Sequence, residues 1–461
     1  MSPLSRPARF VRPSFAFLVL CILLGLAWLT GGASRADALG QIIMRTGAWL
    51  ALIGLGLFGP RPILRQAGPV MWLLMGSLGL VLLQLVPLPL DLWQGLSGRD
   101  ALQGTTQLAG QVPEWRPLSI VPGATLNAAA SLVVPVAILI ATLGIAERER
   151  TWLPAILLSL VLLCALIGLL QFSGAGFNNP FVNDAPGQVS GTFANRNHFA
   201  LFMAIGCVLA PVWAFQEGRR PQRRAPVAVG LVLLFVLTIL ASGSRAGIIV
   251  GILGAVTGIL VVGASLLREL RRYPRWVVLL LLLAVAGVIV GFVALSVSAD
   301  RAESINRVVM DEGDEDMRMR ALPILFALEK LYWPVGTGFG SFDPVFRMAE
   351  PGSLLKPTYF NHAHNDFLEI MLDGGLAGAL LLAGAIGWWG WASFRAWLVG
   401  AGLARARAGS AILLLILVAS LFDYPARTPM MMTVIMLAAL WLNEGSKLSS
   451  RLALPFRGQQ L

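Results

Sequence analysis

The fold is decided by a stretch that joins a polar cluster to a long apolar run, residues 361–394, NHAHNDFLEIMLDGGLAGALLLAGAIGWWGWASF. Its start holds His362 and His364, two of the chain's three histidines. The run at 365–394 is long enough to cross the hydrocarbon core of a bilayer as a helix, which takes about 20 residues. The stretch therefore predicts a transmembrane helix with ionisable side chains at its mouth.

The whole chain has the composition of a membrane protein. Of its 461 residues, 57% are hydrophobic and 13% are charged, whereas soluble domains carry about 25% charged residues. The apolar runs are not short alternating segments, which argues against an outer-membrane barrel. The net charge of +11 is weak evidence for nucleic-acid binding, because Lys and Arg in a membrane protein mainly set its orientation. We expect membrane lipids and no nucleic acid among the partners.

About twelve apolar spans follow one another, so we expect an all-α polytopic membrane helix bundle of about 12 transmembrane helices as a single domain, residues 1–461. The spans are 14–30, 41–58, 69–87, 127–145, 152–172, 197–215, 225–242, 246–265, 276–297, 365–394, 409–421 and 428–443. The first could be a signal peptide, since arginines precede it, but we interpret it as a retained anchor because many spans follow. The three cysteines, which fall inside spans and are expected to be small core residues, are Cys21, Cys164 and Cys207.

The basic residues predict the orientation of these spans. With the N-terminus in the cytoplasm, every short loop on that side is basic and together they hold more than half of the 35 Lys and Arg, as the positive-inside rule requires. Both termini are therefore expected in the cytoplasm, which agrees with an even number of spans. The opposite side then receives a first long segment at 88–126 and a larger loop at 298–364, between the ninth and tenth spans.

Polar clusters occur at the outer ends of the predicted spans and in the larger outer loop, opposite the basic loops that set the orientation. This coincidence predicts one outward-facing site near the membrane surface. The clusters contain Asn195, Arg196, Asn197 and His198; Ser244 and Arg245; Arg318 and Arg320; His362, His364, Asn365, Asp366 and Glu369; and Asp423, Tyr424 and Arg427.

The arginines of these clusters would suit a diphosphate, because guanidinium groups stay charged and bind phosphate oxygens in a two-pronged manner. The alternative is that they extend to lipid headgroups, and for Arg196 and Arg427 both interpretations stay open. Arg245 lies in a very short turn among small residues, which lets other helices approach closely. A binding role is favoured there.

The histidines of the opening stretch are candidates for acid–base chemistry, because a neutral imidazole can take a proton from a sugar hydroxyl. His364 is followed by Asn365 and Asp366, so a nearby carboxylate could orient its ring. A lone histidine is more often structural, as we expect for His198, but two histidines in one polar run favour a function. His362 and His364 could also share a metal, yet no further His or Cys cluster completes a ligand set. Neither a metal nor a cofactor is expected.

The glycine-rich segment 336–340, GTGFG, resembles a phosphate-binding loop only superficially. It lacks the Gly-Lys-Ser/Thr that completes a P-loop. It is also predicted to face a compartment without ATP. We expect a flexible or tight turn there.

In their order and spacing, these clusters resemble the superfamily of O-antigen ligases and O-antigen polymerases of the bacterial inner membrane. The similar motifs cover roughly residues 115–430. They are WRPLS at 115–119, GTFANRNH at 191–198, SGSRAG at 242–247, GTGFGSF at 336–342, HAHNDFLE at 362–369 and SLFDYP at 420–425.

The resemblance implies a glycosyltransferase that takes glycan from an undecaprenyl-diphosphate carrier at the periplasmic face of the inner membrane, without a metal. It makes His364 the base that accepts the proton of the acceptor hydroxyl, with His362 supporting it. The arginines that would hold the diphosphate are Arg245, Arg196 and Arg318, with Arg320 as the alternative to the last. The supporting residues are Asn195, Asn197, Ser244, Asn365, Asp366, Glu369 and Asp423. A direct displacement would invert the anomeric carbon.

The superfamily divides by acceptor. A ligase transfers the finished glycan to lipid A core or a similar acceptor, and a polymerase uses a lipid-linked glycan as acceptor in O-antigen or exopolysaccharide synthesis. We expect the ligase type, with the polymerase as the alternative and 88–126 and 298–364 as acceptor-binding segments. A transporter or flippase is disfavoured, because such proteins usually place ionisable residues near the bilayer midplane. A non-catalytic assembly scaffold is the remaining alternative.

Overall fold

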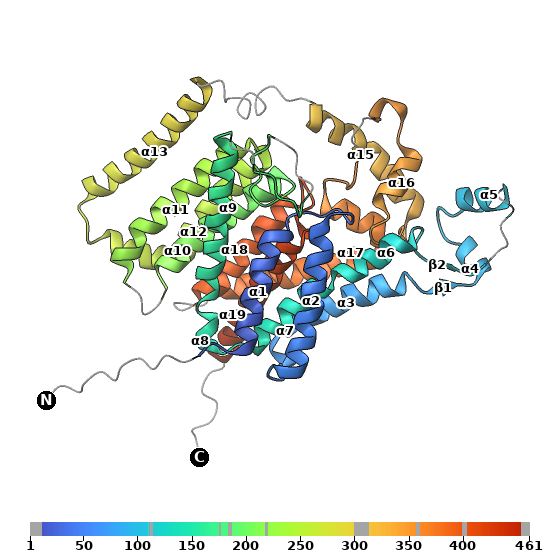
Figure 1. Ribbon diagram of the computed structural model, residues 1–461, viewed down its shortest axis with the longest axis horizontal. Helices are drawn as coiled ribbons and strands as arrows, with labels where there is room; N and C mark the ends of the chain where they lie inside the picture. The colour runs from blue at the N-terminus through green and yellow to red at the C-terminus, as the bar shows by residue number, and fades with distance from the viewer. Residues whose placement is uncertain are drawn as a thin grey trace, which may run out of the picture.

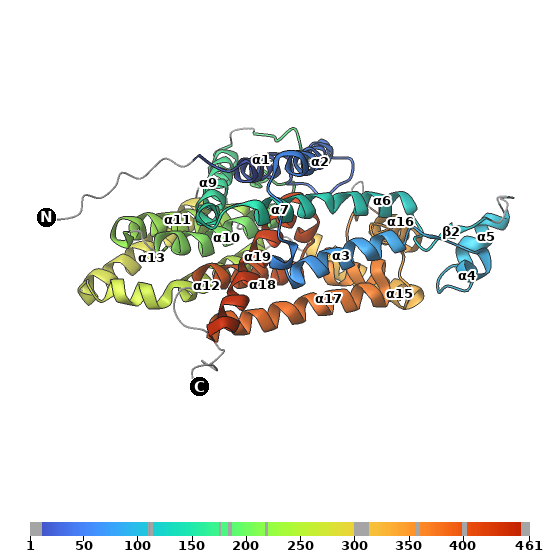
Figure 2. The same ribbon diagram turned by 90° about the horizontal axis from the view of Figure 1, so that it is seen from below.

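The computed structural model is almost entirely helical (Figures 1 and 2). It describes residues 12–108, 110, 114–174, 177–182, 187–216, 220–298, 313–355, 360–398 and 403–452. The strands within these ranges, β1 (Pro87–Leu88) and β2 (Arg116–Pro117), form one short antiparallel pair. The all-α expectation is therefore confirmed.

The N-terminal half builds one wall of the bundle and its first protruding segment. Its elements are α1 (Phe15–Thr30), α2 (Leu39–Phe58), η1 (Leu64–Gln66), α3 (Pro69–Leu83), α4 (Leu90–Gln94), α5 (Asp100–Leu108), α6 (Pro122–Ser131), α7 (Val133–Gly144), α8 (Glu147–Arg150) and α9 (Leu153–Phe172). The pair α4 and α5 lies with β1 and β2 at the far edge of the molecule (Figures 1 and 2). These elements occupy the segment 88–126, which therefore has short helices and strands of its own.

The C-terminal half supplies the centre of the bundle. Its elements are α10 (Arg196–Ala214), α11 (Pro221–Ser242), α12 (Arg245–Leu270), α13 (Arg275–Ser298), α15 (Gly313–Tyr332), α16 (Phe342–Ala349), η2 (Gly352–Leu354), α17 (Asp366–Leu398), α18 (Ala404–Ala419), η3 (Pro425–Arg427) and α19 (Pro429–Leu452). Helix α10 is buried over 83% of its apolar window and packs against α9, α11, α12 and α18. Its glycine-lined contact with α12 lets the two backbones approach closely.

The outer face of the bundle is apolar. Ile22 is 67% exposed, Leu57 70% and Trp72 71%. In water, such a surface would favour association with other chains. In a membrane it faces acyl chains, and the helices satisfy their backbone hydrogen bonds internally, as a bilayer requires.

Among the described residues, 8 helices are long and apolar enough to cross a membrane. They are α2, α6 with α7, α8 with α9, α10, α11, α12, α13 and α17. The other predicted spans coincide with shorter or more polar helices, namely α1, α3, α18 and α19. A multi-pass membrane protein is confirmed, while the number of twelve and the orientation stay predictions.

Chain segments predicted to share the cytoplasmic side lie together at one end of the bundle. The hydroxyl of Ser14, before α1, donates to the carboxylate of Glu149 in α8 at 2.7 Å. Arg150 of the same short helix forms an ion pair with Glu444 of α19. The topology derived from the basic loops is thus compatible with the packing.

The larger of the two long loops, 298–364, contains the helices α15, α16 and η2, and α15 and α16 pack beside α17 (Figure 1). Its residues 299–312 and 356–359 lie outside the described ranges. The helices enclose a second, smaller core that includes Leu325, Tyr332, Phe342 and Phe346. This core includes Leu372 and contacts Leu368, and so packs against the first turns of α17.

The glycine-rich segment 336–340 forms the expected tight turn, and it packs against α17. The amide of Gly340 donates to the carboxylate of Asp373 at 2.9 Å. Opposite the turn, Gly375 interrupts α17 with a φ of 56°, and a Cβ there would lie 2.2 Å from the carbonyl oxygen of Pro334. The turn therefore packs against the helix that directly follows the two histidines.

Candidate active site

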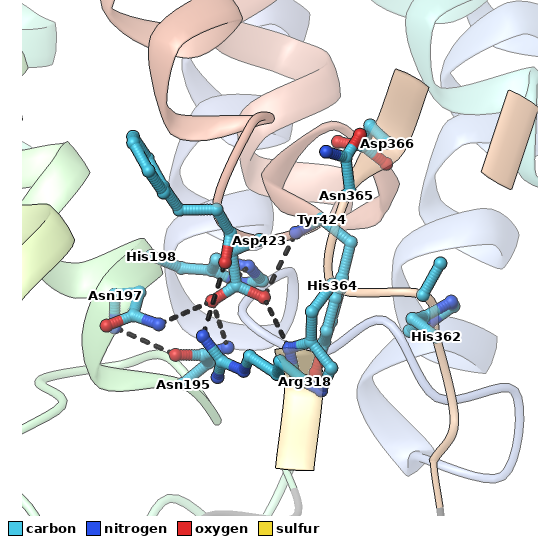
Figure 3. A network of polar contacts seen from close by, with 12 residues as sticks. Asn195, Asn197, His198, Arg318, His362, His364, Asn365, Asp366, Asp423 and Tyr424 are labelled. Carbon is cyan, nitrogen blue, oxygen red and sulfur yellow. Dashed lines mark hydrogen bonds and ion pairs between the residues drawn. The ribbon is translucent and has the colours of Figure 1, made fainter. Parts of the chain in front are cut away.

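The predicted clusters converge on the turn between α18 and η3. The starts of α10 and α12, the helix α15 and the segment 360–365 all contribute side chains there (Figure 3). The centre of this group is the carboxylate of Asp423, which is only 2% exposed. Segments separated by up to 228 positions along the sequence are thereby joined at one residue.

Both oxygens of Asp423 accept several hydrogen bonds. Its Oδ1 lies 3.2 Å from Nδ1 of His364 and accepts the amide of Tyr424 at 3.0 Å. Its Oδ2 accepts the side-chain amides of Asn195 at 2.8 Å and Asn197 at 2.7 Å. A buried carboxylate with this many donors is both fixed in place and kept ionised.

The pKa of Asp423 is consequently depressed. Burial alone would raise it, but the hydrogen bond from His364 and the positive charge of Arg318 help to hold the pKa well below the ordinary value of an aspartate. A carboxylate can only accept at this contact, so the neutral ring of His364 carries its hydrogen on Nδ1. The lone pair on Nε2 is then available to take a proton.

The backbone at His364 is strained. Its φ of 51° is positive, which no other non-glycine residue shows among the described ones. Such backbone costs about 1–3 kcal/mol and persists where the surroundings enforce it, often at functional sites. The contact with Asp423 holds the His364 side chain, and the next residue is held because Oδ1 of Asn365 caps α17 by accepting the amides of Phe367 and Leu368, at 3.0 and 3.1 Å.

Helices α10 and α12 are tied to Asp423 through their capping residues. Asn195 caps α10 by accepting the amide of Asn197 at 2.8 Å. Ser244 caps α12 by accepting the amide of Gly247, also at 2.8 Å, and its hydroxyl donates to Oδ1 of Asn197 at 2.6 Å. This contact turns the Asn197 amide nitrogen toward Asp423.

The candidate diphosphate-binding arginines take their places from the same elements. Arg196 is the first residue of α10 and Arg245 the first of α12, where the helix dipole adds to the positive charge. Arg318 extends from α15 toward Asp423, and its Nη1 donates to the carbonyl of Phe422 at 3.3 Å (Figure 3). Arg320 is exposed two positions further along α15. Arg318 therefore contacts the turn that carries Asp423, and the choice between the two loop candidates stays a prediction.

His362 belongs to a second network, which uses the other carboxylates. Its Nδ1 lies 2.9 Å from Oε1 of Glu369. Arg427 pairs with the same Glu369 oxygen at 3.1 Å and with Asp366 at 3.2 Å. The two carboxylates raise the pKa of Arg427, against the opposing effect of its burial. Arg427 thus pairs with two buried carboxylates.

The ring of Tyr424 lies among all three histidines. Its centroid is 4.2 Å from that of His362, 5.0 Å from that of His364 and 5.2 Å from that of His198. Burial raises the pKa of Tyr424 above its ordinary value, so the phenol stays neutral. The sequence analysis gave this residue no role, although its position beside Asp423 was a signal. His198 is buried in α10, and its structural role stays a prediction.

A cavity of about 830 Å³ opens beside this site. Its wall includes His362 and Arg427, but His364 and Asp423 are not among its lining residues. The opposite wall comes from the N-terminal half and includes Arg45 of α2, which the sequence analysis overlooked. A cation within an apolar span is rare and usually has a function, so the position of Arg45 in the span 41–58 could have identified it as a candidate.

Comparison with known proteins agrees with the motif analysis. Residues 230–383 match the model of a family described as O-Antigen ligase. The segment contains Arg245, Arg318, His362 and His364, whereas Asp423 lies beyond it. A search of curated proteins finds no match to the chain. The resemblance is confirmed over the matched segment.

Proposed function

We propose, on the premise that residues 230–383 are an O-antigen ligase domain of a multi-pass membrane protein, that this chain is a ligase of that type. It would transfer a glycan from undecaprenyl diphosphate to a hydroxyl of lipid A core or a similar acceptor. The reaction would take place at the periplasmic face of the bacterial inner membrane. The observation that supports this most directly is the contact of His364 with the buried carboxylate of Asp423.

In the proposed mechanism, Nε2 of His364 takes the proton from the acceptor hydroxyl. Asp423 stabilises the imidazolium that forms. The acceptor oxygen bonds to the anomeric carbon while the bond from that carbon to the diphosphate breaks, which inverts the centre. The diphosphate keeps the electron pair, and Arg196, Arg245 and Arg318 would stabilise its charge without rearranging, so no metal is needed.

The test is transfer by the purified protein with an undecaprenyl-diphosphate-linked glycan as donor. His364→Ala is expected to lower the transfer rate by about 10²- to 10⁴-fold, the usual contribution of a general base. Arg268→Gln is the control, because Arg268 contacts Ala264 and Ser265 of its own helix, at the opposite end of α12 from Ser244. Normal transfer by a folded His364→Ala protein would refute the proposal.

The acceptor is tested in the host, with a deletion of the gene and analysis of surface glycans. Loss of capped lipopolysaccharide would indicate a ligase. Capping with a single repeat would indicate an O-antigen polymerase, and unaltered lipopolysaccharide with loss of a secreted polymer would indicate an exopolysaccharide enzyme. Complementation with the His364→Ala variant should fail in each case.

A further inference from the structure

His198 is a second histidine beside the carboxylate of Asp423, and it faces the oxygen that His364 does not contact (Figure 3). It lies in the first turn of α10 and is 2% exposed. Its Nε2 is 3.9 Å from Oδ2 of Asp423, which is too long for a direct hydrogen bond. Among the described residues, neither ring nitrogen of His198 has a hydrogen-bond partner. Buried polar atoms normally pair with a protein group or with an ordered water, so this ring calls for a further partner.

A cavity of about 10 Å³ is lined by both His198 and Asp423. Asn197 is its third polar lining residue, and the rest of its wall consists of apolar residues of α10, α12, α18 and η3. A buried water needs about 10–15 Å³ of such volume and two to four polar partners. The cavity therefore suits one water molecule and nothing larger.

We propose that this cavity holds one ordered water that joins His198 to Asp423, and that His198 is a positioning residue for transfer. The water accepts the hydrogen on Nε2 of His198 and donates to Oδ2 of Asp423. Its second hydrogen goes to Oδ1 of Asn197, which accepts the hydroxyl of Ser244 and has a second lone pair to offer. Three hydrogen bonds are the usual number for a buried water.

The tautomer of His198 follows from this arrangement. With its hydrogen on Nε2, the ring carries only a lone pair on Nδ1, so no buried donor is left unpaired. The ring of Tyr424 fixes the imidazole from one side, in an edge-to-face contact with centroids 5.2 Å apart. His198 therefore presents Nε2 toward the carboxylate in a fixed direction.

The effect of His198 on the reaction passes through Asp423. The side-chain amides of Asn195 and Asn197 already bind Oδ2, and the water adds a further donor to the same oxygen. Each donor on Oδ2 limits rotation of the carboxylate and so keeps Oδ1 on Nδ1 of His364. Because His198 is almost fully buried and does not line the cavity of about 830 Å³, it acts on the base and not on the substrates. This role rests on the proposed function.

The water is tested in a density map of the purified wild-type protein that resolves ordered water at other buried polar groups. A peak is expected within about 2.7–3.2 Å of both Nε2 of His198 and Oδ2 of Asp423. A cavity without density in such a map would overturn the proposal, and so would a direct contact between the two side chains. The map requires no catalysis, so its result is independent of the proposed function.

The positioning role is tested with two substitutions of the same residue. His198→Phe keeps a ring beside Tyr424 but removes both nitrogens, and it should lower kcat by about 3- to 10-fold with the donor KM unchanged, as for loss of one hydrogen bond. His198→Gln places an amide donor near the position of Nε2 and should restore most of the rate. A wild-type kcat in folded His198→Phe would refute the role, and so would equal losses in the two variants.

Thr142→Val is the matched control for removing a buried polar group. The Thr142 hydroxyl of α7 is buried and has no hydrogen-bond partner among the described residues, but it lies in no cluster of the candidate site. This variant should keep the wild-type kcat. A loss equal to that of His198→Phe would show a general effect of repacking the bundle and would overturn the specific role of His198.

A double-mutant cycle decides whether His198 acts through Asp423. If it does, His198→Phe combined with Asp423→Asn should transfer as fast as Asp423→Asn alone, within about twofold. Losses that multiply would contradict this path. Full activity of His364→Ala would refute the proposed base while the water peak still stands. Inactive His364→Ala beside fully active, folded His198→Phe would refute only the role of His198.

Discussion

The Nδ1 atom of His364 lies 3.2 Å from Oδ1 of Asp423, a carboxylate 59 positions further along the chain. His364 has closer acidic neighbours in sequence, Asp366 and Glu369, and the sequence analysis expected a nearby carboxylate as its partner. The structure assigns those two to Arg427 and His362 instead. The residue that orients His364 is therefore supplied by the turn after α18.

Asp423 is expected to act as a positioning residue. Asp423→Asn keeps the size of the side chain but removes the charge that fixes the tautomer of His364. Transfer should fall by about 10- to 100-fold, the range known for loss of the carboxylate that orients a metal-binding histidine. The readout is kcat with the KM for the donor unchanged, and a raised donor KM at normal kcat would contradict this role.

The depressed pKa of Asp423 also predicts a pH dependence of stability. In the native protein the group stays ionised at a pH where an unfolded aspartate, with a pKa of about 3.9, already binds a proton. The unfolded state then binds more protons, so stability falls as the pH falls. Between about pH 5 and pH 3, the Tm of the wild type should decrease more steeply than that of Asp423→Asn. If the Tm of the two proteins in detergent falls equally with pH, the ionisation of Asp423 does not contribute to this pH dependence.

Ser244 is expected to link α12 to the site. Ser244→Ala removes both the cap of α12 and the contact with Asn197, and loss of a cap costs about 1 kcal/mol. Thermal denaturation should show a lower Tm together with reduced transfer. Ser159→Ala is the matched control, because the exposed Ser159 hydroxyl donates to the carbonyl of Ala155 in its own helix.

Gly375 is expected to be required for the packing of α17 against the glycine-rich turn. Gly375→Ala should cost about 1–3 kcal/mol from its backbone conformation alone, with a further cost from the clash with Pro334. Gly384→Ala in the same helix has no atom within 4 Å of the added Cβ and should leave the Tm unchanged or slightly raised. Equal Tm values for Gly375→Ala and Gly384→Ala would show that Gly375 is not required for the packing of α17 against the turn.

Much of the architecture could be predicted because it depends on local patterns. Apolar runs of bilayer length predict helices wherever they occur, and each predicted span coincides with a described helix. The polar clusters could be predicted to share one side of the membrane, because the two ends of a transmembrane helix lie on opposite sides of it. Arg45 escaped notice because it lies within an apolar span, away from any motif.

Sequence by itself determined that this chain is a helical membrane protein with two histidines at the mouth of a helix. It also determined the order of the motifs. Both the apolar spans and the motifs are patterns of consecutive residues, so neither depends on tertiary packing. Only the tertiary structure decided which carboxylate each histidine contacts. It also decided that Tyr424 lies among three histidines and that Arg45 shares a cavity with His362. The physical reason is that these contacts depend on how whole helices pack, and spacing along one segment does not fix the position of another.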